Sequence, residues 1–121
     1  MKMKNTNKRA VGSLYEKLAG EYLVSQGYEI VEYNFYSRSG EIDIVAKHGD
    51  YLVFVEVKYR ENVKTGHPFE AVSVLKQRAI SKCAMYYLQK NGLHDIPIRF
   101  DVVGIVGETI QLIQNAFEFI R

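Results

Sequence analysis

Residues 51–60, YLVFVEVKYR, constrain the fold of this chain more than any other segment. The run is rich in β-branched and aromatic residues, which are enriched in β-strands. It nevertheless places a carboxylate, Glu56, and an ammonium, Lys58, within the most hydrophobic strand that the sequence predicts. Burial of a charged group is costly unless the group is paired. The strand therefore predicts charged partners, or a function, for these two residues.

The chain length indicates a single domain, because 121 residues leave no room for two. Hydrophobic residues make up 47% and charged residues 25%, and these values are typical of a globular protein rather than a disordered one. We expect residues 1–8 to form a flexible basic tail and residues 9–121 to form one domain.

The cysteine and histidine content excludes several kinds of site. The single cysteine, Cys83, rules out a disulfide framework and a cysteine-only metal site, and it lies on the apolar face of a predicted helix. The three histidines show no zinc-ligand spacing. No apolar run approaches the roughly 18 residues that a membrane span needs. We expect a cytoplasmic protein that has no membrane partner.

The distribution of charge is more informative than the net charge of +2. Residues 1–9 hold four basic residues and no acidic one, and residues 58–82 hold six basic residues and two acidic ones. The rest of the chain is acidic. Two basic segments of this kind suit a local contact with a polyanion such as nucleic acid. Ordinary solvated surface is the alternative that charge alone leaves open.

The order of predicted elements indicates an α/β fold. Apolar spacing predicts a helix over residues 9–26, ended by Gly27, and a second helix that starts at Pro68 and stops near Asn91. Runs of β-branched, aromatic and alternating residues predict strands at 28–36, 41–47, 51–60, 98–106 and 109–114. Residues 116–120 are expected to form a short cover. The order α-β-β-β-α-β-β favours a mixed central β-sheet flanked by helices.

The turn at residues 49–50 sets the expected register of the second and third strands. A two-residue loop that begins with Gly49 suits a type II′ turn, and opposing residue numbers then sum to 99. Asp43 would face Glu56, and Glu41 would face Lys58, with each pair on one face of the sheet. Ile42 and Ile44 would lie together on the opposite face of the sheet. A three-residue loop would instead place Asp43 and Glu56 on opposite faces.

Two adjacent carboxylates and a lysine suit the hydrolysis of a phosphodiester. Carboxylates held side by side repel each other unless a cation lies between them or one is protonated. Carboxylate oxygens and water are the ligands that Mg²⁺ prefers. A neighbouring lysine can orient a water nucleophile or stabilise developing negative charge. The alternative is a solvated face that carries a weak Glu41–Lys58 ion pair.

The motifs resemble a known nuclease pattern and a known family. GEIDIVA at 40–46 and FVEVKYR at 54–60 resemble the PD-(D/E)xK pattern of nucleases. Over residues 12 to 120 the chain resembles the YraN family, uncharacterised protein family 0102. The resemblance is carried by an ordered set: Glu16, Ala19, Tyr22-Leu23, Gly27-Tyr28, Asn34, Gly40 to Asp43, Phe54 to Lys58, Arg60, Gly66, Pro68, Lys76, Arg99 to Asp101 and Asn115 to Phe117. Tyr15 departs from it, because the family usually has glycine there.

The resemblance implies a restriction-endonuclease-like core, similar to that of archaeal Holliday-junction resolvases. In that superfamily the aspartate and the glutamate bind Mg²⁺ or Mn²⁺, and the lysine acts on the attacking water. A glutamate of the first helix often joins the metal ligands. Carried over to this chain, these residues are Asp43, Glu56, Lys58 and Glu16.

Further charged residues are candidates for contact with nucleic acid. Arg60 and Lys64 flank a loop at the end of the Glu-x-Lys strand, and Lys76 and Arg78 lie on the second predicted helix. A solvent-exposed helix face is the alternative for the latter two. Asp101 follows Arg99 by two residues, which favours a structural ion pair.

These observations lead to three expectations of function. The first is a metal-dependent endonuclease that acts on structured or branched DNA, with Mg²⁺ or Mn²⁺ as cofactor. The second is a nucleic-acid-binding module that has a nuclease-like fold and does not cut. The third is a protein-interaction adaptor. A homodimer would suit a substrate that has two-fold character.

Overall fold

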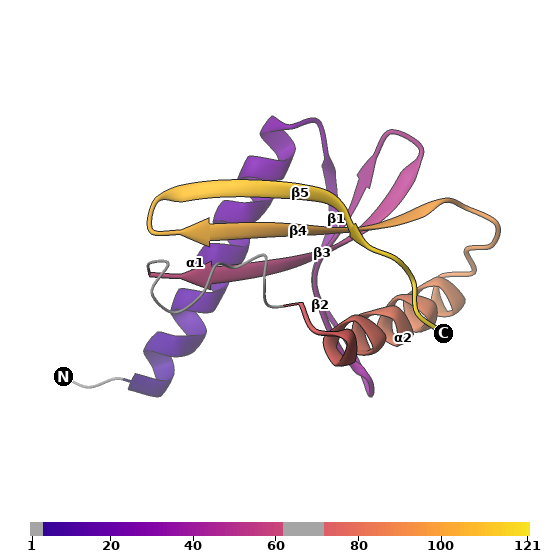
Figure 1. The fold of residues 1–121 in the computed structure, drawn as a ribbon, viewed down its shortest axis with the longest axis horizontal. Coiled ribbons are helices and arrows are strands. Elements are labelled where there is room, and N and C mark those ends of the chain that lie inside the picture. Colours follow the sequence, from indigo (N-terminus) through magenta and orange to yellow (C-terminus); the bar gives the residue numbers. More distant parts are fainter. Residues whose placement is uncertain (1–3, 62–71) are drawn as a thin grey trace.

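The computed structural model describes residues 4–61 and 72–121, with side chains from residue 11 onwards (Figure 1). The elements follow the predicted order α-β-β-β-α-β-β. They are α1 (Lys4–Ser25), β1 (Glu29–Ser37), β2 (Gly40–His48), β3 (Tyr51–Arg60), α2 (Val74–Lys90), β4 (Ile98–Val106) and β5 (Thr109–Phe117). No helix in these ranges is long and apolar enough to cross a membrane.

The five strands form one mixed sheet in the order β1-β2-β3-β4-β5. All neighbours are antiparallel except β3 and β4, which are parallel. A parallel pair needs a crossover connection, and α2 lies between β3 and β4 in the chain. The predicted mixed sheet flanked by helices is therefore confirmed.

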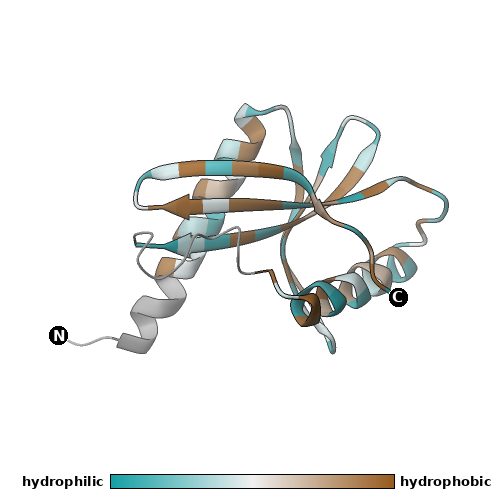
Figure 2. Ribbon diagram, viewed as in Figure 1, coloured by the Kyte–Doolittle hydropathy of each residue, from teal (hydrophilic) through white to brown (hydrophobic). Residues whose placement is uncertain are grey.

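The two helices cover opposite faces of the sheet, and each face has its own core. On one face Ala19 and Leu23 of α1 pack with side chains that include Val53 and Val103. On the other face α2 packs against β1 to β5, and Cys83 of α2 is fully buried there, as expected. Figure 2 shows β3 brown in its middle and teal at its carboxyl end, where the charged residues begin.

The ends of α1 differ in how well the sequence predicts them. The C-terminal end is confirmed, because Gly27 adopts a φ of +94° and the Tyr28 N–H bonds to the Leu23 carbonyl. The start is wrong by five residues: α1 begins at Lys4, not Arg9. Residues 4–8, which the sequence assigned to a tail, are therefore helical. The departure from the family pattern, Tyr15, stacks on Tyr59 with ring centroids 3.8 Å apart.

The start of α2 is set by a side-chain cap. The helix was predicted to begin at Pro68, which lies outside the described residues, but it begins at Val74. Ser73 is extended, with φ −68° and ψ 162°, and its Oγ accepts a hydrogen bond from the Lys76 N–H at 3.1 Å. An extended residue whose side chain accepts a hydrogen bond from a backbone N–H of the first helical turn is an N-cap, so the helix begins at the next residue.

Replacement of Ser73 by alanine is expected to destabilise the protein by about 1 kcal/mol, because an N–H at the start of α2 would lose its acceptor. Urea denaturation followed by circular dichroism measures this change. Ser39→Ala, at an exposed serine in the β1–β2 turn, is the control and should change stability by less than about 0.5 kcal/mol. Equal stability of the two variants would contradict the assigned cap.

The last strand is longer than expected, and the end of the chain covers the α2 face. β5 continues to Phe117 rather than stopping at residue 114. The backbone N–H of Ile120 donates a hydrogen bond to Ser81 Oγ of α2 at 3.0 Å. Phe119 packs against the core on that face. The predicted cover is therefore confirmed.

Candidate functional site

The β2–β3 hairpin has the predicted register from its turn to the pair Ile44 and Val55. His48 pairs with Tyr51, and every pair up to Ile44–Val55 keeps a sum of 99. The two-residue loop has Gly49 at φ +60°. The ladder does not extend to Glu41 and Lys58, so their predicted direct pairing is not part of it. The strands part at Asp43.

The alternation of β2 is interrupted at Asp43. Ile42 packs in the core beneath α2, whereas Ile44 packs in the core beneath α1. The prediction that these two isoleucines share a face is therefore wrong. The residue opposite this point on β1 is Asn34, between the paired residues Tyr33 and Phe35, and it adopts a φ of +56°. A left-handed residue of this kind reorients a strand locally.

The Asp43 carboxylate makes a hydrogen bond to β3 at the point where the backbone ladder between β2 and β3 stops. Its Oδ2 accepts a hydrogen bond from the backbone N–H of Val57 at 2.7 Å. This contact ties β2 to β3 beyond the last backbone pair. It also holds the carboxyl group next to Glu56, which is only 8% exposed. The predicted proximity of these two acidic side chains is thus observed, although a side-chain contact rather than a backbone pair produces it.

Burial raises the pKa of Asp43 to about 8, and the negative charge of Glu56 adds to this increase. Burial also raises the pKa of Glu56, while Lys76 and Lys58 oppose the increase. A hydrogen bond from Asp43 acts in the same direction as the lysines. These directions fit a pair in which Asp43 holds a proton and Glu56 carries the charge.

Two further carboxylates join this pair. Glu16, Glu41 and Asp43 each place one carboxylate oxygen within 4.8 Å of the others. We call these three residues together with Glu56 the acidic cluster. Glu16 is half-buried on α1, and burial raises its pKa, while a hydrogen bond from the Asn34 side chain lowers it. The cluster therefore brings together side chains from α1, β2 and β3.

Sequence reasoning gave Glu16 only through the family resemblance and did not assign Glu41 to the site. One available signal was overlooked. Ala19 and Leu23, which are both fully buried on α1, lie three and seven positions after Glu16. This spacing puts Glu16 on the helix face that meets the sheet. No comparable local signal exists for Glu41, because its position depends on the interruption at Asp43.

Comparison with known proteins agrees with the motifs. Residues 15–105 match the model of the uncharacterised protein family UPF0102. The chain belongs to this family. It is 52% identical over 113 residues to a UPF0102 protein of Lachnoclostridium phytofermentans, covering 93% of this chain and 96% of that protein. A Clostridioides difficile UPF0102 protein is 46% identical, covering 92% of this chain and 99% of its own length. The Chromohalobacter salexigens UPF0102 protein is 42% identical and covers all of this chain and 95% of its own length.

The predicted basic residues of this UPF0102 member lie in different environments. Lys76 Nζ lies 3.7 Å from Glu56 Oε2, although 45% of its side chain is exposed, so it adjoins the acidic cluster. Arg78 is exposed on α2. Arg60 is partly buried and donates a hydrogen bond to the Tyr59 carbonyl at 2.8 Å. Lys64 lies outside the described residues.

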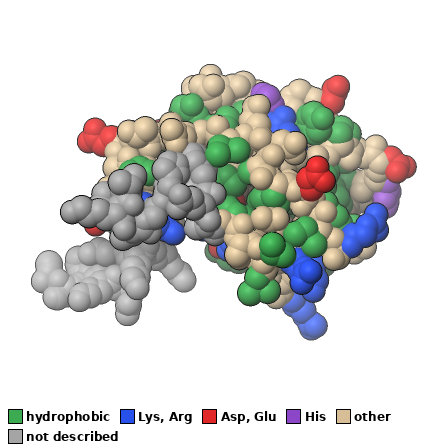
Figure 3. Space-filling model, in the orientation of Figure 1, with side chains coloured by type: hydrophobic (Ala, Val, Ile, Leu, Met, Phe, Trp, Pro, Cys, Tyr) green, Lys and Arg blue, Asp and Glu red, His purple; other side chains and the backbone are tan. Residues whose placement is uncertain are grey.

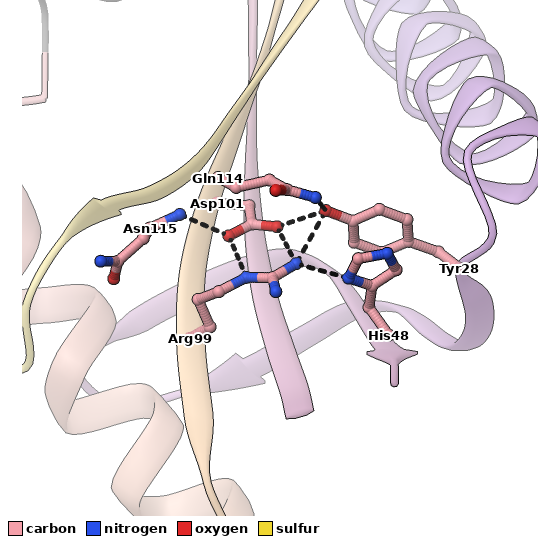
Figure 4. Close-up of polar contacts among 6 residues, drawn as sticks. All are labelled: Tyr28, His48, Arg99, Asp101, Gln114 and Asn115. Carbon is pink, nitrogen blue, oxygen red and sulfur yellow. Dashed lines mark hydrogen bonds and ion pairs between the residues drawn. The ribbon is translucent and has the colours of Figure 1, made fainter. Parts of the chain in front are cut away.

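Asp101 belongs to a separate network, shown in Figure 4. The fully buried carboxylate bonds Arg99 through both of its oxygens at 2.9 Å. It also accepts from the Tyr28 hydroxyl at 2.6 Å and from the Asn115 N–H at 2.9 Å. Arg99 further donates to His48 Nδ1 at 3.0 Å. The predicted structural ion pair is confirmed. The sequence did not predict its further partners, which are Tyr28 just before β1, His48 on β2 and Asn115 on β5.

The donor set of the acidic cluster fits a hard divalent cation. Among the described residues, the group of possible metal ligands consists of Glu16, Glu41 and Asp43, which offer only carboxylate oxygens, and Glu56 adds a fourth carboxylate through its contact with Asp43. Oxygen donors of this kind favour Mg²⁺ and Mn²⁺ over softer metals. Lys58 lies two residues after Glu56, and its charge acts on that carboxylate. The cluster thus combines possible metal ligands with a nearby ammonium group.

Proposed function

We propose that this protein is a metal-dependent endonuclease that hydrolyses phosphodiester bonds in structured or branched DNA. The observation that carries the proposal is the convergence of Asp43 and Glu56 at the point where β2 and β3 part. Burial raises the pKa of both groups, and the charge of Glu56 adds to the increase at Asp43, so a negative charge on Asp43 beside Glu56 is costly. A bound cation would remove that cost. The resemblance to PD-(D/E)xK nucleases implies the same two residues, Asp43 and Glu56, as metal ligands.

The residues divide into metal-binding and water-positioning roles. Asp43 and Glu56 would hold Mg²⁺ or Mn²⁺, and Glu16 would complete the ligand set. When bound, the cation would supply Lewis-acid stabilisation of the phosphoryl oxygens and lower the pKa of a bound water. Lys58 would orient the attacking water and balance negative charge as it develops on the phosphate.

The basic residues would hold the nucleic-acid backbone. Arg60 lies at the end of β3, next to the charged part of that strand, and Arg78 is exposed on α2. Contacts of this kind position a phosphate backbone without reading its sequence. Nucleic acid is the proposed partner, the cytoplasm the proposed setting, and a homodimer would match a two-fold substrate.

The test is cleavage of a panel of branched, flapped, duplex and single-stranded DNAs in the presence of Mg²⁺ or Mn²⁺. Glu56→Gln and Lys58→Met should each lower the cleavage rate by at least about a hundredfold, since each removes a group that acts on the transition state. Glu108→Gln, at an exposed glutamate in the β4–β5 turn, is the matched control and should cleave like the wild type.

Each alternative has its own outcome in this assay. Cleavage retained by a pure Glu56→Gln preparation would refute the assigned site. Salt-dependent DNA binding with no metal-dependent cleavage would support a non-catalytic binding module instead. Absence of any DNA affinity at low salt, with a stable protein partner, would support an adaptor.

A further inference from the structure

Lys76 meets the acidic cluster from the side opposite to Glu16. Glu16 belongs to α1 and Lys76 to α2, and these helices cover opposite faces of the sheet. The Lys76 Nζ lies 3.7 Å from Oε2 of Glu56. Glu56 is buried, whereas almost half of the Lys76 side chain is open to solvent. A buried carboxylate is thus paired with an ammonium group that still reaches the surface.

Lys76 occupies a helix position that does not favour a lysine. It is the third residue of α2, and its backbone N–H donates to the N-cap Ser73 at 3.1 Å. The N-terminus of a helix carries partial positive charge, and a glutamate or glutamine at this position would complete a capping box. The positive charge of Lys76 is therefore balanced by Glu56 on the sheet and not by its own helix.

The charge of Lys76 acts on Glu56 as a bound cation would. Burial raises the pKa of Glu56, and Lys76 opposes this increase more strongly than Lys58 does. A divalent cation beside the same carboxylate would also favour its charged form. Lys76 and the cation are both positive, so they compete for one carboxylate, and each weakens the binding of the other.

The helix that carries Lys76 suits contact with a polyanion. Residues 74–90 hold four basic residues and no acidic one, and Arg78 and Lys82 are exposed. Figure 3 shows blue Lys and Arg side chains at the lower right, where α2 lies in Figure 1. Lysine binds phosphate as a point charge on a flexible stem. A DNA phosphate that shared a cation with Glu56 would lie beside the same carboxylate, within reach of Lys76.

We propose that Lys76 exchanges partners: it neutralises Glu56 in the metal-free protein and moves to a phosphate of the bound DNA when a divalent cation occupies the acidic cluster. The exchange couples the two ligands, because Lys76 becomes available to the phosphate only when it leaves Glu56. Metal and DNA should therefore each strengthen the binding of the other. The inference rests on the proposed function and adds to it a residue that links the metal ligands to the substrate.

Calorimetric titration with Mn²⁺ alone tests the first half of the exchange without DNA. Lys76→Met removes the competing charge and should tighten Mn²⁺ binding by about three- to tenfold. Lys76→Arg keeps the charge and should stay within about twofold of the wild type. Lys82→Met, at an exposed lysine of the same helix, is the matched control and should bind Mn²⁺ like the wild type.

DNA binding with and without a cation tests the second half. A fluorescein-labelled flap DNA is titrated with the full-length protein in EDTA and in saturating Ca²⁺, a cation that carboxylate oxygens bind, and anisotropy is recorded. Ca²⁺ should tighten DNA binding by the wild type. This gain should fall by about fivefold or more in Lys76→Met, which lacks the freed phosphate contact. Lys76→Arg and Lys82→Met should keep the gain.

Two results would overturn the exchange. An unchanged Mn²⁺ affinity in Lys76→Met would show that Lys76 does not compete for Glu56. Equal loss of DNA affinity in EDTA and in Ca²⁺ would make Lys76 a permanent phosphate contact, and no loss in either would make it an ordinary solvated lysine. Both expected results, obtained with a wild type that cleaves none of the DNAs in the panel, would refute the nuclease activity and leave the exchange in place.

Discussion

Replacement of Asp43 by asparagine is expected to stabilise the fold by about 2 kcal/mol at pH 8 and to remove divalent-cation binding. The pKa of Asp43 is raised from 3.8 to about 8 in the folded protein, by burial first and then by Glu56. Each pKa unit corresponds to about 1.4 kcal/mol, although part of the shift belongs to the pair. Asparagine keeps an oxygen that can accept from the Val57 N–H and carries no charge.

The pH dependence of this effect follows from the direction of the pKa shift. Because the folded-state pKa of Asp43 is raised, the folded protein holds a proton that the unfolded chain releases above pH 3.8. The contribution to stability is complete below that pH and is lost as the pH rises through about 8. The stability advantage of Asp43→Asn should therefore grow between these two values, which thermal unfolding at several pH values measures.

Cation binding supplies the second readout for the same variant. Saturating Mn²⁺ at pH 8 should raise the unfolding temperature of the wild type, because a ligand that binds only the folded state stabilises it. It should not raise that of Asp43→Asn. Asp50→Asn, an exposed aspartate in the β2–β3 turn, is the control and should respond to Mn²⁺ like the wild type. A variant less stable than the wild type at pH 8, or an equal response to Mn²⁺, would contradict the assignment.

Replacement of Asp101 by alanine is expected to destabilise the protein by about 3–5 kcal/mol, the largest loss of stability among these variants. The carboxylate is fully buried and accepts hydrogen bonds from Arg99, Tyr28 and Asn115. Its removal leaves the Arg99 guanidinium, whose side chain is 11% exposed, without its counter-ion. The Tyr28 hydroxyl would lose its acceptor as well.

Urea denaturation measures this loss as a lower midpoint with an unchanged slope. Asp101→Asn keeps the shape and one acceptor oxygen and should lose less stability than the alanine variant. Glu108→Ala, at an exposed position, should stay within about 0.5 kcal/mol of the wild type. Any DNA cleavage per folded molecule should be unaffected, because the network is separate from the acidic cluster. A loss below 1 kcal/mol would show that the network contributes little to stability.

The sequence predicted most of the fold because the deciding signals are local. Alternation and β-branched content located the five strands, and Gly49-Asp50 predicted the hairpin register that the structure has from His48 to Ile44. Glycine with a positive φ marked the end of α1 at Gly27. The helix starts were missed; that of α2 is set by Ser73, whose Oγ accepts a hydrogen bond from the Lys76 N–H three residues later.

The candidate site was predicted in part, for a physical reason that concerns Asp43. The pairing rule brought Asp43 and Glu56 together, but strict alternation cannot describe a strand whose side chains change face at one residue. That change separates Ile42 from Ile44 and accompanies the positive φ of Asn34 on the neighbouring strand. It depends on how β1 and β2 pack between two helices, which no short stretch of sequence records.

The amino-acid sequence by itself determined the order of the elements, the two-residue turn and the placement of Glu56 and Lys58 in a hydrophobic strand. Only the tertiary structure decided that Glu16 and Glu41 join Asp43, that Lys76 pairs with Glu56, and that Asp101 lies in a different network. The first set follows from backbone preferences that act over a few residues. The second depends on helices docking on opposite faces of the sheet, which brings together charges far apart in the chain.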